Sequence, residues 1–573
     1  MIDDQLAGAV AAALKKAQQR NKLPPFDLPT SIPVERPKQA GMGDFATPIC
    51  LQLARYARMA PIQIAEIVAD ILRERHVDNL PFLASVEIAH PGFINFRLDE
   101  GWLQEQVPVI LAAPDTFGDV DLGQGARVQV EYVSANPTGP LHMGSARNAV
   151  LGDALASTLE AAGYTVQREY YVNDAGSRVQ VFGETLLARY AQALGHEAKL
   201  PEEGYHGQYM IELGQQIAAE HGERFLQMPR EEAVPALGRL GIEAVIADAR
   251  ADLALLGIEY DGWFSEQSLY DRRLNETIMT MLRQGDYLYV HEGAVWFRAT
   301  ALGGDKDEVV IRSNGTPGYF ASDIAYHYEK FVERGFDRVI DVWGADHQGH
   351  VPRMKAMMRA LDLDPERLTI IIYQLVTLKR GGEIVRLSKR TGDMITLREV
   401  LDEVGADAMR YFLLSRSADS QMDFDIDLAK EQSDENPVYY VQYAHARICS
   451  ILRHGQEVLG GALGAGDDAS GLTPTDVDLS LLTSKAELDL IRQMLRLPET
   501  VRLAAIQLAP HHLTYYAYEL AQAFHAFYRD CRVVSNEPGE AEITRARIAL
   551  VTACRAVLAR VLGLMGMSAP ETM

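Results

Sequence analysis

Two short segments of the chain have residue types and spacing suited to binding phosphate. The first is PLHMGS at Pro140–Ser145, between a predicted strand and a predicted helix. The free N–H groups and partial positive charge of a helix N-terminus attract anions. Gly144 permits close backbone approach, and His142 can donate a hydrogen bond to a phosphate oxygen. A helix cap with a surface histidine is the alternative, and this motif alone leaves both open.

The second segment is RLSKRTG at Arg386–Gly392, which follows two glycines at Gly381 and Gly382. Its flanking glycines predict a loop. Three cations and a hydroxyl in one loop could clamp a triphosphate. Taken alone, a solvated basic loop is the simpler interpretation.

An alternation of strands and helices could bring these segments to one edge of a sheet. RVQVEYV from Arg127, the helical pattern after Ser145 and TVQREYYV from Thr165 predict a βαβ unit. A second α/β stretch runs from Arg312 to Val376. The sequence therefore predicts a multidomain α/β protein with a split Rossmann-type nucleotide fold.

Domain boundaries follow from changes in this pattern. Residues 1–112 read as helices followed by a strand pair with a Pro-Gly turn, an α+β domain. The Rossmann-type catalytic domain is predicted at 113–400, with a helical insertion at about 178–300. A connecting helical segment at 401–436 precedes an all-α bundle at 437–573.

The net charge of −24 opposes a nucleic-acid partner if it is taken alone, because phosphate contacts need a basic surface. The charge is unevenly distributed along the chain. Residues 437–573 carry 12 Lys and Arg against 14 Asp and Glu, so most of the negative charge lies before them. Charge therefore leaves RNA binding open and does not support it.

Cysteine spacing and hydropathy predict a cytoplasmic protein without zinc or a membrane span. The four cysteines show no C-x-x-C spacing, and a reduced compartment fits them. The N-terminus has acidic residues before any basic one, unlike a signal peptide. No apolar run approaches the roughly 20 residues that a membrane helix needs.

The two phosphate-binding segments, in this order with α/β sequence between them, resemble the HIGH and KMSKS signatures of class I aminoacyl-tRNA synthetases. Further segments are similar to the arginyl-tRNA synthetase family over nearly the whole chain: GDFAT, PGFINF, VEYVSANPTGPLHMG, YYVNDAG, YFASDIAYH, WGADHQGH, YYVQYAHAR and LGLMGMSAPETM. The resemblance implies ATP-dependent activation of L-arginine, with Mg²⁺ accompanying ATP. Transfer to the 2′-hydroxyl of the terminal adenosine of tRNA-Arg would follow, in an enzyme expected to be a monomer with an anticodon-binding C-terminal bundle.

Two positions depart from the family pattern. Ser145 stands where HIGH usually ends in His, and Arg386 stands where KMSKS begins with Lys. Lys389, the second lysine of that signature, is present, as in the branch of the family that uses the loop lysine. A catalytically impaired, tRNA-binding relative of the synthetases is the alternative. A class I enzyme specific for cysteine is disfavoured, since that family usually has a zinc site and this chain lacks a matching cysteine cluster.

The resemblance assigns ATP and catalysis to three segments. It gives catalytic roles to His142, Gly144, Ser145 and Lys389. It assigns the adenosine part of ATP to Gly344, Asp346 and His347, which follow an apolar strand. His347 could equally be a structural histidine. The full set of ATP-binding residues is His142, Gly144, Ser145, Gly344, Asp346, His347, Arg386, Ser388 and Lys389, with Arg390 assisting.

Arginine recognition requires a carboxylate that accepts the forked donors of a guanidinium. The resemblance places Tyr319 and Asp323 at this pocket; a helix cap is the alternative for Asp323. It places Glu131, Ser134, Asn136 and His142 around the amino and carboxylate end of arginine. Glu131 lies in an apolar strand, where a cationic ligand would relieve the cost of burying its charge.

The resemblance also implies contacts with tRNA at both ends of the chain. Tyr440 and Tyr443 would share a helix face, where aromatic rings can stack on unpaired bases, although core packing explains the spacing equally well. Met573 matches a position near the anticodon loop. Phe93 and Asn95 match the module that meets the tRNA elbow.

Overall fold

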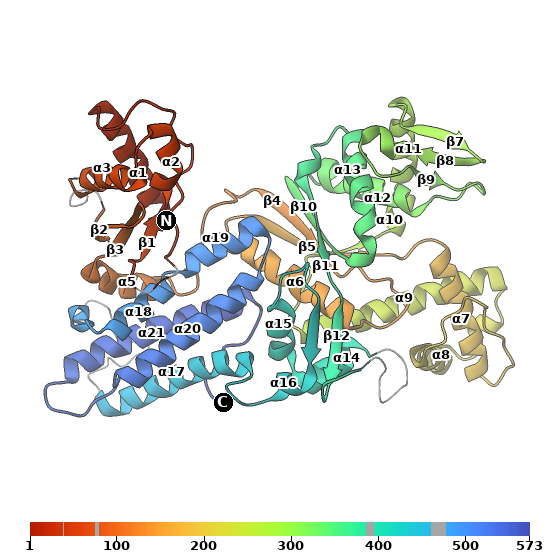
Figure 1. Ribbon diagram of the computed structural model, residues 1–573. Coiled ribbons are helices and arrows are strands. Elements are labelled where there is room, and N and C mark those ends of the chain that lie inside the picture. The colour runs from red at the N-terminus through yellow and green to blue at the C-terminus, as the bar shows by residue number, and fades with distance from the viewer. Residues whose placement is uncertain (38, 40, 75–79, 386–394, 460–476) are drawn as a thin grey trace.

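The computed structural model describes residues 1–573 except 38, 40, 75–79, 386–394 and 460–476 (Figure 1). The N-terminal part is an α+β unit whose described helices accompany a three-stranded antiparallel sheet of order β1-β3-β2. Its elements are α1 (Ile2–Gln19), β1 (Phe45–Thr47), α2 (Ile49–Ala57), α3 (Pro61–Arg73), β2 (Leu83–Ala89) and β3 (Phe93–Leu98). The predicted strand pair with its Pro-Gly turn is confirmed.

Helix α5 (Glu100–Ala112) connects this unit to the C-terminal bundle. The side chain of Gln104 is buried and donates to the carbonyl oxygen of Leu482 at 3.1 Å. Arg36 makes a second link, with its guanidinium on the Glu499 carboxylate at 2.8 Å. Segments from opposite ends of the sequence therefore lie side by side, as Figure 1 shows for α5 and α18.

The catalytic sheet has five parallel strands in the order β11-β10-β4-β5-β6. Their bounds are β4 (Arg127–Glu131), β5 (Thr165–Val172), β6 (Gly262–Ser265), β10 (Arg338–Gly344) and β11 (Leu368–Tyr373). Alternation along β4 puts Gln129 and Glu131 on one face and the apolar Val128 and Val130 on the other. The first βαβ unit, with α6 (Met143–Ala161) between β4 and β5, is confirmed.

The region 178–300 contains more than the predicted helical insertion. Its helices are α7 (Ser177–Ala193), α8 (Gln208–His221), α9 (Arg230–Leu255), α10 (Gln267–Asp271) and α11 (Leu274–Gln284). However, β6 is the edge strand of the catalytic sheet. A separate antiparallel sheet comprises β7 (Leu288–His291) and β8 (Ala294–Phe297) of this region together with β9 (Glu308–Ile311), which follows it. The prediction missed these strands because four residues are too few for a clear alternation.

Helix α12 (Tyr319–Tyr328) continues into a π-helical turn at Glu329–Glu333, and α13 (Val351–Ala360) follows β10. A further three-stranded sheet, of order β13-β12-β14, lies beyond β11. Its strands and neighbouring helices are β12 (Val376–Arg380), β13 (Glu383–Ile384), α14 (Leu397–Val404), α15 (Ala406–Leu414), β14 (Met422–Asp425) and α16 (Ile426–Lys430). The predicted connecting helical segment therefore also contains one short strand, β14.

The C-terminal part is an all-α bundle, as predicted. Its helices are α17 (Pro437–Leu459), α18 (Lys485–Met494), α19 (Leu497–Gln507), α20 (His511–Asp530) and α21 (Ala541–Leu564). Every helix in the described part of the chain is too short or too polar to cross a lipid bilayer.

A buried arginine joins this bundle to the catalytic domain. The Arg410 guanidinium, which is fully buried, donates to the carbonyl oxygens of Met565 at 2.6 Å and Leu256 at 2.7 Å. It also pairs with Asp153 on α6. The ends of α9 and α21 are thereby fixed to the helix that begins with the first phosphate-binding segment.

Candidate active site

His142 is the N-cap of α6. Its Nδ1 accepts a hydrogen bond from the Gly144 N–H at 3.1 Å, which places the ring proton on Nε2. Burial lowers the pKa of His142 and favours the neutral ring. The helix-cap interpretation is confirmed, and its geometry leaves Nε2–H able to donate, so the phosphate contact of His142 stays a prediction.

The backbone beside His142 allows little choice of residue at position 144. A Cβ on Gly144 would lie 2.9 Å from Cε1 of His142, closer than a normal contact. The glycine therefore lets the imidazole ring fold back over the helix start. Ser145 is buried in the first turn of α6, with 6% of its surface exposed.

The residues that follow the second phosphate-binding motif lie beside His142. An antiparallel bridge joins His142 to Thr396, and the Leu397 N–H donates to the Leu141 carbonyl oxygen at 2.7 Å. Arg386, Ser388, Lys389 and Arg390 lie outside the described residues. The residues that follow them nevertheless meet the first motif, and Thr396 caps α14 through its side-chain oxygen.

A cavity of about 580 Å³ opens at this junction. His142, Thr396 and Arg398 contribute to its walls, together with Tyr209 from the helical insertion. The Tyr209 hydroxyl donates to the Thr138 carbonyl oxygen at 2.6 Å and so connects the insertion to the segment before α6.

Gly344, Asp346 and His347 lie at the carboxyl end of β10, where open α/β sheets bind ligands. The Asp346 and His347 side chains are 79% and 59% exposed and lie 3.3 Å apart. His347 is therefore exposed and paired with Asp346, so its role at the adenosine side stays a prediction beside the structural alternative.

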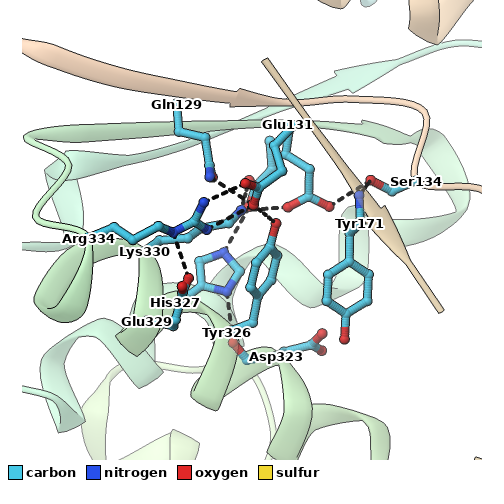
Figure 2. Close-up of polar contacts among 12 residues, drawn as sticks. Gln129, Glu131, Ser134, Tyr171, Asp323, Tyr326, His327, Glu329, Lys330 and Arg334 are labelled. Atoms are coloured by element: carbon cyan, nitrogen blue, oxygen red, sulfur yellow. Dashed lines mark hydrogen bonds and ion pairs between the residues drawn. The ribbon is translucent and has the colours of Figure 1, made fainter. Parts of the chain in front are cut away.

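Three carboxylates occupy equivalent positions on adjacent parallel strands. Asp341 of β10 is the register partner of Glu131 of β4, which is the register partner of Glu169 of β5. All three side chains are buried. Since the register is shared, the three carboxylates form a row on the sheet face that α12 covers, and Figure 2 shows Glu131 and its contacts there.

Cations from α12 and the turn after it meet this row. The Lys330 ammonium contacts Glu131 Oε2 at 2.5 Å and Asp341 Oδ1 at 3.1 Å, and Arg334 pairs with Glu169. Glu131 is thus paired within the chain. The sequence-based reason for a cationic ligand at Glu131, relief of an unpaired buried charge, does not apply, because Lys330 already supplies that relief.

Asp323 lies in the second turn of α12, whose N-cap is Gly318, so it is not the helix cap that the alternative required. Its carboxylate accepts no hydrogen bond among the described residues, and Figure 2 shows it pointing toward the Tyr171 side chain. Burial, opposed in part by His327, raises the pKa of Asp323 from 3.8 to about 6. Such a carboxylate gains most from a cationic ligand.

Two neighbours of Asp323, the acidic Glu266 and the aromatic Tyr171, were not predicted from the sequence. Burial chiefly, with Asp323 and Asp174 nearby, raises the pKa of Glu266 from 4.5 to about 7. Asp323 and Glu266 also contribute to the raised pKa of Tyr171, after its burial. Glu266 belongs to the 178–300 region, which contained no recognisable motif, so the sequence gave no signal for it.

The other predicted arginine-binding residues differ in their exposure to solvent. Tyr319 begins α12 one turn before Asp323 and is 57% exposed, with the Arg312 guanidinium 5.5 Å from its ring centre. Ser134 donates to Glu131 Oε1 at 2.9 Å. Asn136 is exposed in the segment that leads to α6.

The predicted tRNA-binding residues lie in two distant regions. Tyr440 packs against Tyr518 and His525 with ring centres 5.1 and 4.7 Å away, and Tyr443 stacks on Tyr439 at 5.9 Å. Tyr440 and Tyr443 are half-buried, so they contribute to the bundle surface and to its packing.

Met573 is 56% exposed at the C-terminus. Phe93 is half-buried on β3, whereas Asn95 is only 4% exposed. The Asn95 amide lies 3.9 Å from the Met42 sulfur. Contacts with RNA at these three positions stay predictions.

Three family models match the chain in succession. They describe an arginyl tRNA synthetase N terminal domain at residues 4–98, the catalytic domain of class I (R) tRNA synthetases at 106–206 and 244–429, and a DALR anticodon binding domain at 441–573.

Relatives and a solved structure agree with these matches. The arginine–tRNA ligase of Dehalococcoides mccartyi is 51% identical over 565 residues, covering 99% of this chain and 98% of the relative. That of Caldanaerobacter subterraneus subsp. tengcongensis is 47% identical, covering 100% and 98%. The Thermus thermophilus arginyl-tRNA synthetase structure shares the fold, with a TM-score of 0.74 at 24% identity and full coverage of both chains. This chain therefore belongs to the arginyl-tRNA synthetase family of class I enzymes.

Proposed function

We propose that the chain carries out arginine–tRNA ligation at the carboxyl edge of its five-stranded sheet. Its relatives are named for that reaction over their whole length. The observation that supports this location best is Asp323, a half-buried carboxylate that accepts no hydrogen bond from the described residues and points toward the side chain of Tyr171 on β5 of this sheet. The alternative of a tRNA-binding protein without catalysis gains no support from these relatives.

Arginine binds with its guanidinium on Asp323, and Glu266 adds a second carboxylate on the same side. A forked, permanently charged donor satisfies such a pair, whereas a neutral amino acid leaves the carboxylates unpaired and is rejected. Tyr319 covers the pocket from the first turn of α12. Glu131, Ser134, Asn136 and His142 hold the amino and carboxylate end.

In the first step the arginine carboxylate attacks the α-phosphorus of ATP, and pyrophosphate leaves. Mg²⁺ enters with ATP as part of the substrate. His142 donates from Nε2 to a phosphate oxygen at the mouth of α6, and Gly144 and Ser145 contribute the helix N-terminus. Lys389, with Arg386, Ser388 and Arg390, stabilises the departing pyrophosphate. Gly344, Asp346 and His347 border the adenosine. Catalysis then consists of positioning and charge stabilisation.

In the second step the 2′-hydroxyl of the terminal adenosine of tRNA-Arg attacks the arginyl carbonyl, and AMP leaves. Residues 437–573 bind the anticodon region through Tyr440, Tyr443 and Met573. Residues 1–112 meet the tRNA elbow through Phe93 and Asn95. The catalytic domain spans 113–400 and the connecting segment 401–436. We propose that the enzyme acts as a cytoplasmic monomer.

Pyrophosphate exchange with a panel of amino acids tests this function. The full chain, supplied with ATP, Mg²⁺ and unacylated tRNA-Arg, should exchange labelled pyrophosphate with arginine and not with lysine, citrulline or cysteine. Tight tRNA binding without any amino-acid-dependent exchange would instead support the catalytically impaired alternative.

A further inference from the structure

The carboxylates of Asp341, Glu131 and Glu169 lie in one row and repel one another when ionised. This repulsion affects the arginine site, because Glu131 belongs to it. Neighbouring strands place these buried carboxylates side by side, where like charges oppose ionisation. Glu131 is the member at the carboxyl end of β4, next to the turn that leads to His142. The protein must therefore hold Glu131 ionised and in one orientation if that carboxylate is to bind the amino group of arginine.

Lys330 is the cation that faces two of these three carboxylates. Its side chain is fully buried, and its ammonium bridges Glu131 and Asp341 at 2.5 and 3.1 Å. The Tyr326 ring centre lies 4.1 Å from the same nitrogen. Arg334 is committed elsewhere, to Glu169 and to Glu329. Figure 2 shows Lys330 reaching the row from beneath, between Arg334 and His327.

The backbone at Lys330 has an unusual conformation that affects where its side chain points. Lys330 belongs to the π-helical turn Glu329–Glu333, where the Arg334 N–H bonds to the Glu329 carbonyl oxygen at 2.9 Å. A π-helical turn inserts one residue and changes the direction of the side chains that follow it, and such turns are frequent at functional sites. Asp323 lies near the start of α12, which continues into this turn. One continuous helical element therefore carries both Asp323, at the proposed guanidinium end of the arginine site, and Lys330, at the proposed amino end.

The second oxygen of Glu131 is fixed from the opposite side. Oε1 accepts from the Ser134 hydroxyl at 2.9 Å, and the Ser134 hydroxyl accepts from the Tyr171 N–H at 3.1 Å. Val133 and Ser134 have φ angles of 68° and 41°, a left-handed conformation that non-glycine residues rarely adopt. The strained turn thus places Ser134 against Glu131.

We propose that Lys330 is a positioning residue, which holds Glu131 as an oriented carboxylate and through it fixes the amino end of bound arginine. This inference rests on the proposed contact between Glu131 and the substrate amino group. Without Lys330, the described residues leave Asp341 paired with His327, which lies 2.9 Å from its Oδ2, and leave Glu131 with the neutral Ser134 hydroxyl and no ion pair. Glu131 would then take up a proton or turn away, and its attraction for an ammonium group would be lost.

The test compares two ligands that differ only in the amino group. Arginine and 5-guanidinopentanoate are titrated calorimetrically into the full chain with unacylated tRNA and without ATP. Lys330→Gln should weaken arginine binding about tenfold or more, the loss of one charge-assisted hydrogen bond. It should change binding of the amino-free analogue by less than about threefold. Equal losses for both ligands, or no loss for arginine, would overturn the proposal.

Two further variants separate structural damage and failure of the proposed function from failure of this inference. Asp341→Asn removes a buried carboxylate of the same network but leaves the contact between Lys330 and Glu131, so arginine affinity should persist even where the melting temperature falls. Comparable weakening of arginine by Asp341→Asn would assign Lys330 a merely structural role. If Glu131→Gln leaves arginine affinity unchanged, the proposed amino contact itself is wrong; if only Lys330→Gln is silent, the inference alone fails.

Discussion

The backbones of His142 and Thr396 form an antiparallel bridge, although more than half of the catalytic domain separates them in sequence. This bridge brings the chain that follows the second phosphate-binding motif back to the first. A segment from Lys389 to Thr396 can extend at most about 25 Å. The bridge thus satisfies one requirement of a shared nucleotide site, a short path between Lys389 and the mouth of α6.

Lys389→Ala tests whether the second motif serves chemistry or RNA binding. Removing a cation that stabilises departing pyrophosphate should lower the maximal rate of arginine-dependent exchange by about tenfold to a thousandfold. The dissociation constant of tRNA-Arg should stay within about twofold of the wild-type value. Lys430→Ala removes a half-exposed lysine that pairs with Glu403 and serves as the control. Equal losses of rate and tRNA affinity would mark Lys389 as an RNA contact.

The elements that the sequence predicted are those with enough length to show a period. Helix α6, strands β4 and β5 and the β2–β3 pair each span at least five residues, and their apolar spacing is regular. Strands β6 and β14 have four residues each. They become strands because parallel neighbours, β5 and β12, supply hydrogen bonds, and such tertiary pairing leaves no local pattern.

The residues of the candidate active site also divide into those that the sequence predicted and those that it did not. His142, Glu131 and Asp323 stand in recognisable motifs, whereas Glu266 and Lys330 do not. Lys330 meets Glu131 only because sheet register and a π-helical turn bring them together, and neither can be read from local sequence. The cost of burying Glu131 was correctly anticipated, but the cation that offsets it belongs to the chain itself.

Asp323→Asn should lower the affinity for arginine and raise the stability of the free enzyme. Loss of the carboxylate should raise the arginine KM by about a hundredfold or more while the ATP KM stays near the wild-type value. The pKa of Asp323 is raised in the folded protein, so its ionised form opposes folding at neutral pH. The neutral amide should therefore stabilise the free enzyme, by about 1–2 kcal/mol after allowance for partial exposure.

Exchange kinetics and thermal denaturation at pH 7.5 measure the two effects. Glu329→Gln is the matched control, because Glu329 directly follows α12 and pairs with Arg334. An unchanged arginine KM in Asp323→Asn would remove Asp323 from the pocket. A lower melting temperature would show that its charge is already compensated.

Arginine use should depend on pH through the same carboxylates. Burial raises the pKa of Asp323 to about 6 and that of Glu266 to about 7. Because only the ionised forms attract a guanidinium, kcat/KM for arginine should fall as pH drops from 8 toward 5. Groups that face Asp323 and influence this profile are His327, Glu131, Asp341, Lys330 and Glu266.

The pH dependence of the ATP KM serves as the control for the pH dependence of kcat/KM for arginine. The ATP KM, measured across the same range at saturating arginine, should not follow the decline, since the pocket carboxylates do not contact ATP. Asp323→Asn should flatten the part of the profile near pH 6. A wild-type profile that is level from pH 8 to 5 would contradict the raised pKa values in the free enzyme.

The junction at Arg410 predicts that a single methyl group in the C-terminal tail disturbs the whole enzyme. Gly566 has φ of 68°, and a Cβ there would overlap the Arg410 guanidinium. Gly566→Ala must therefore displace a buried arginine from Asp153 and from the carbonyl oxygens of Leu256 and Met565. Leaving these charges unpaired should cost about 3–5 kcal/mol of unfolding free energy.

Gly563→Ala provides the matched control for that substitution, three residues earlier and in the last turn of α21. A Cβ at Gly563 meets no atom within 4 Å, and alanine favours a helix over glycine by about 0.5–1 kcal/mol. Urea denaturation should therefore show Gly563→Ala slightly more stable than wild type and Gly566→Ala much less stable. Since Arg410 also holds the helix that His142 caps, arginine-dependent exchange should fall in Gly566→Ala even at temperatures where it stays folded. Equal stabilities for the two variants would mean that Arg410 can relax without cost, and that the bundle and the phosphate-binding helix are not fixed to each other through it.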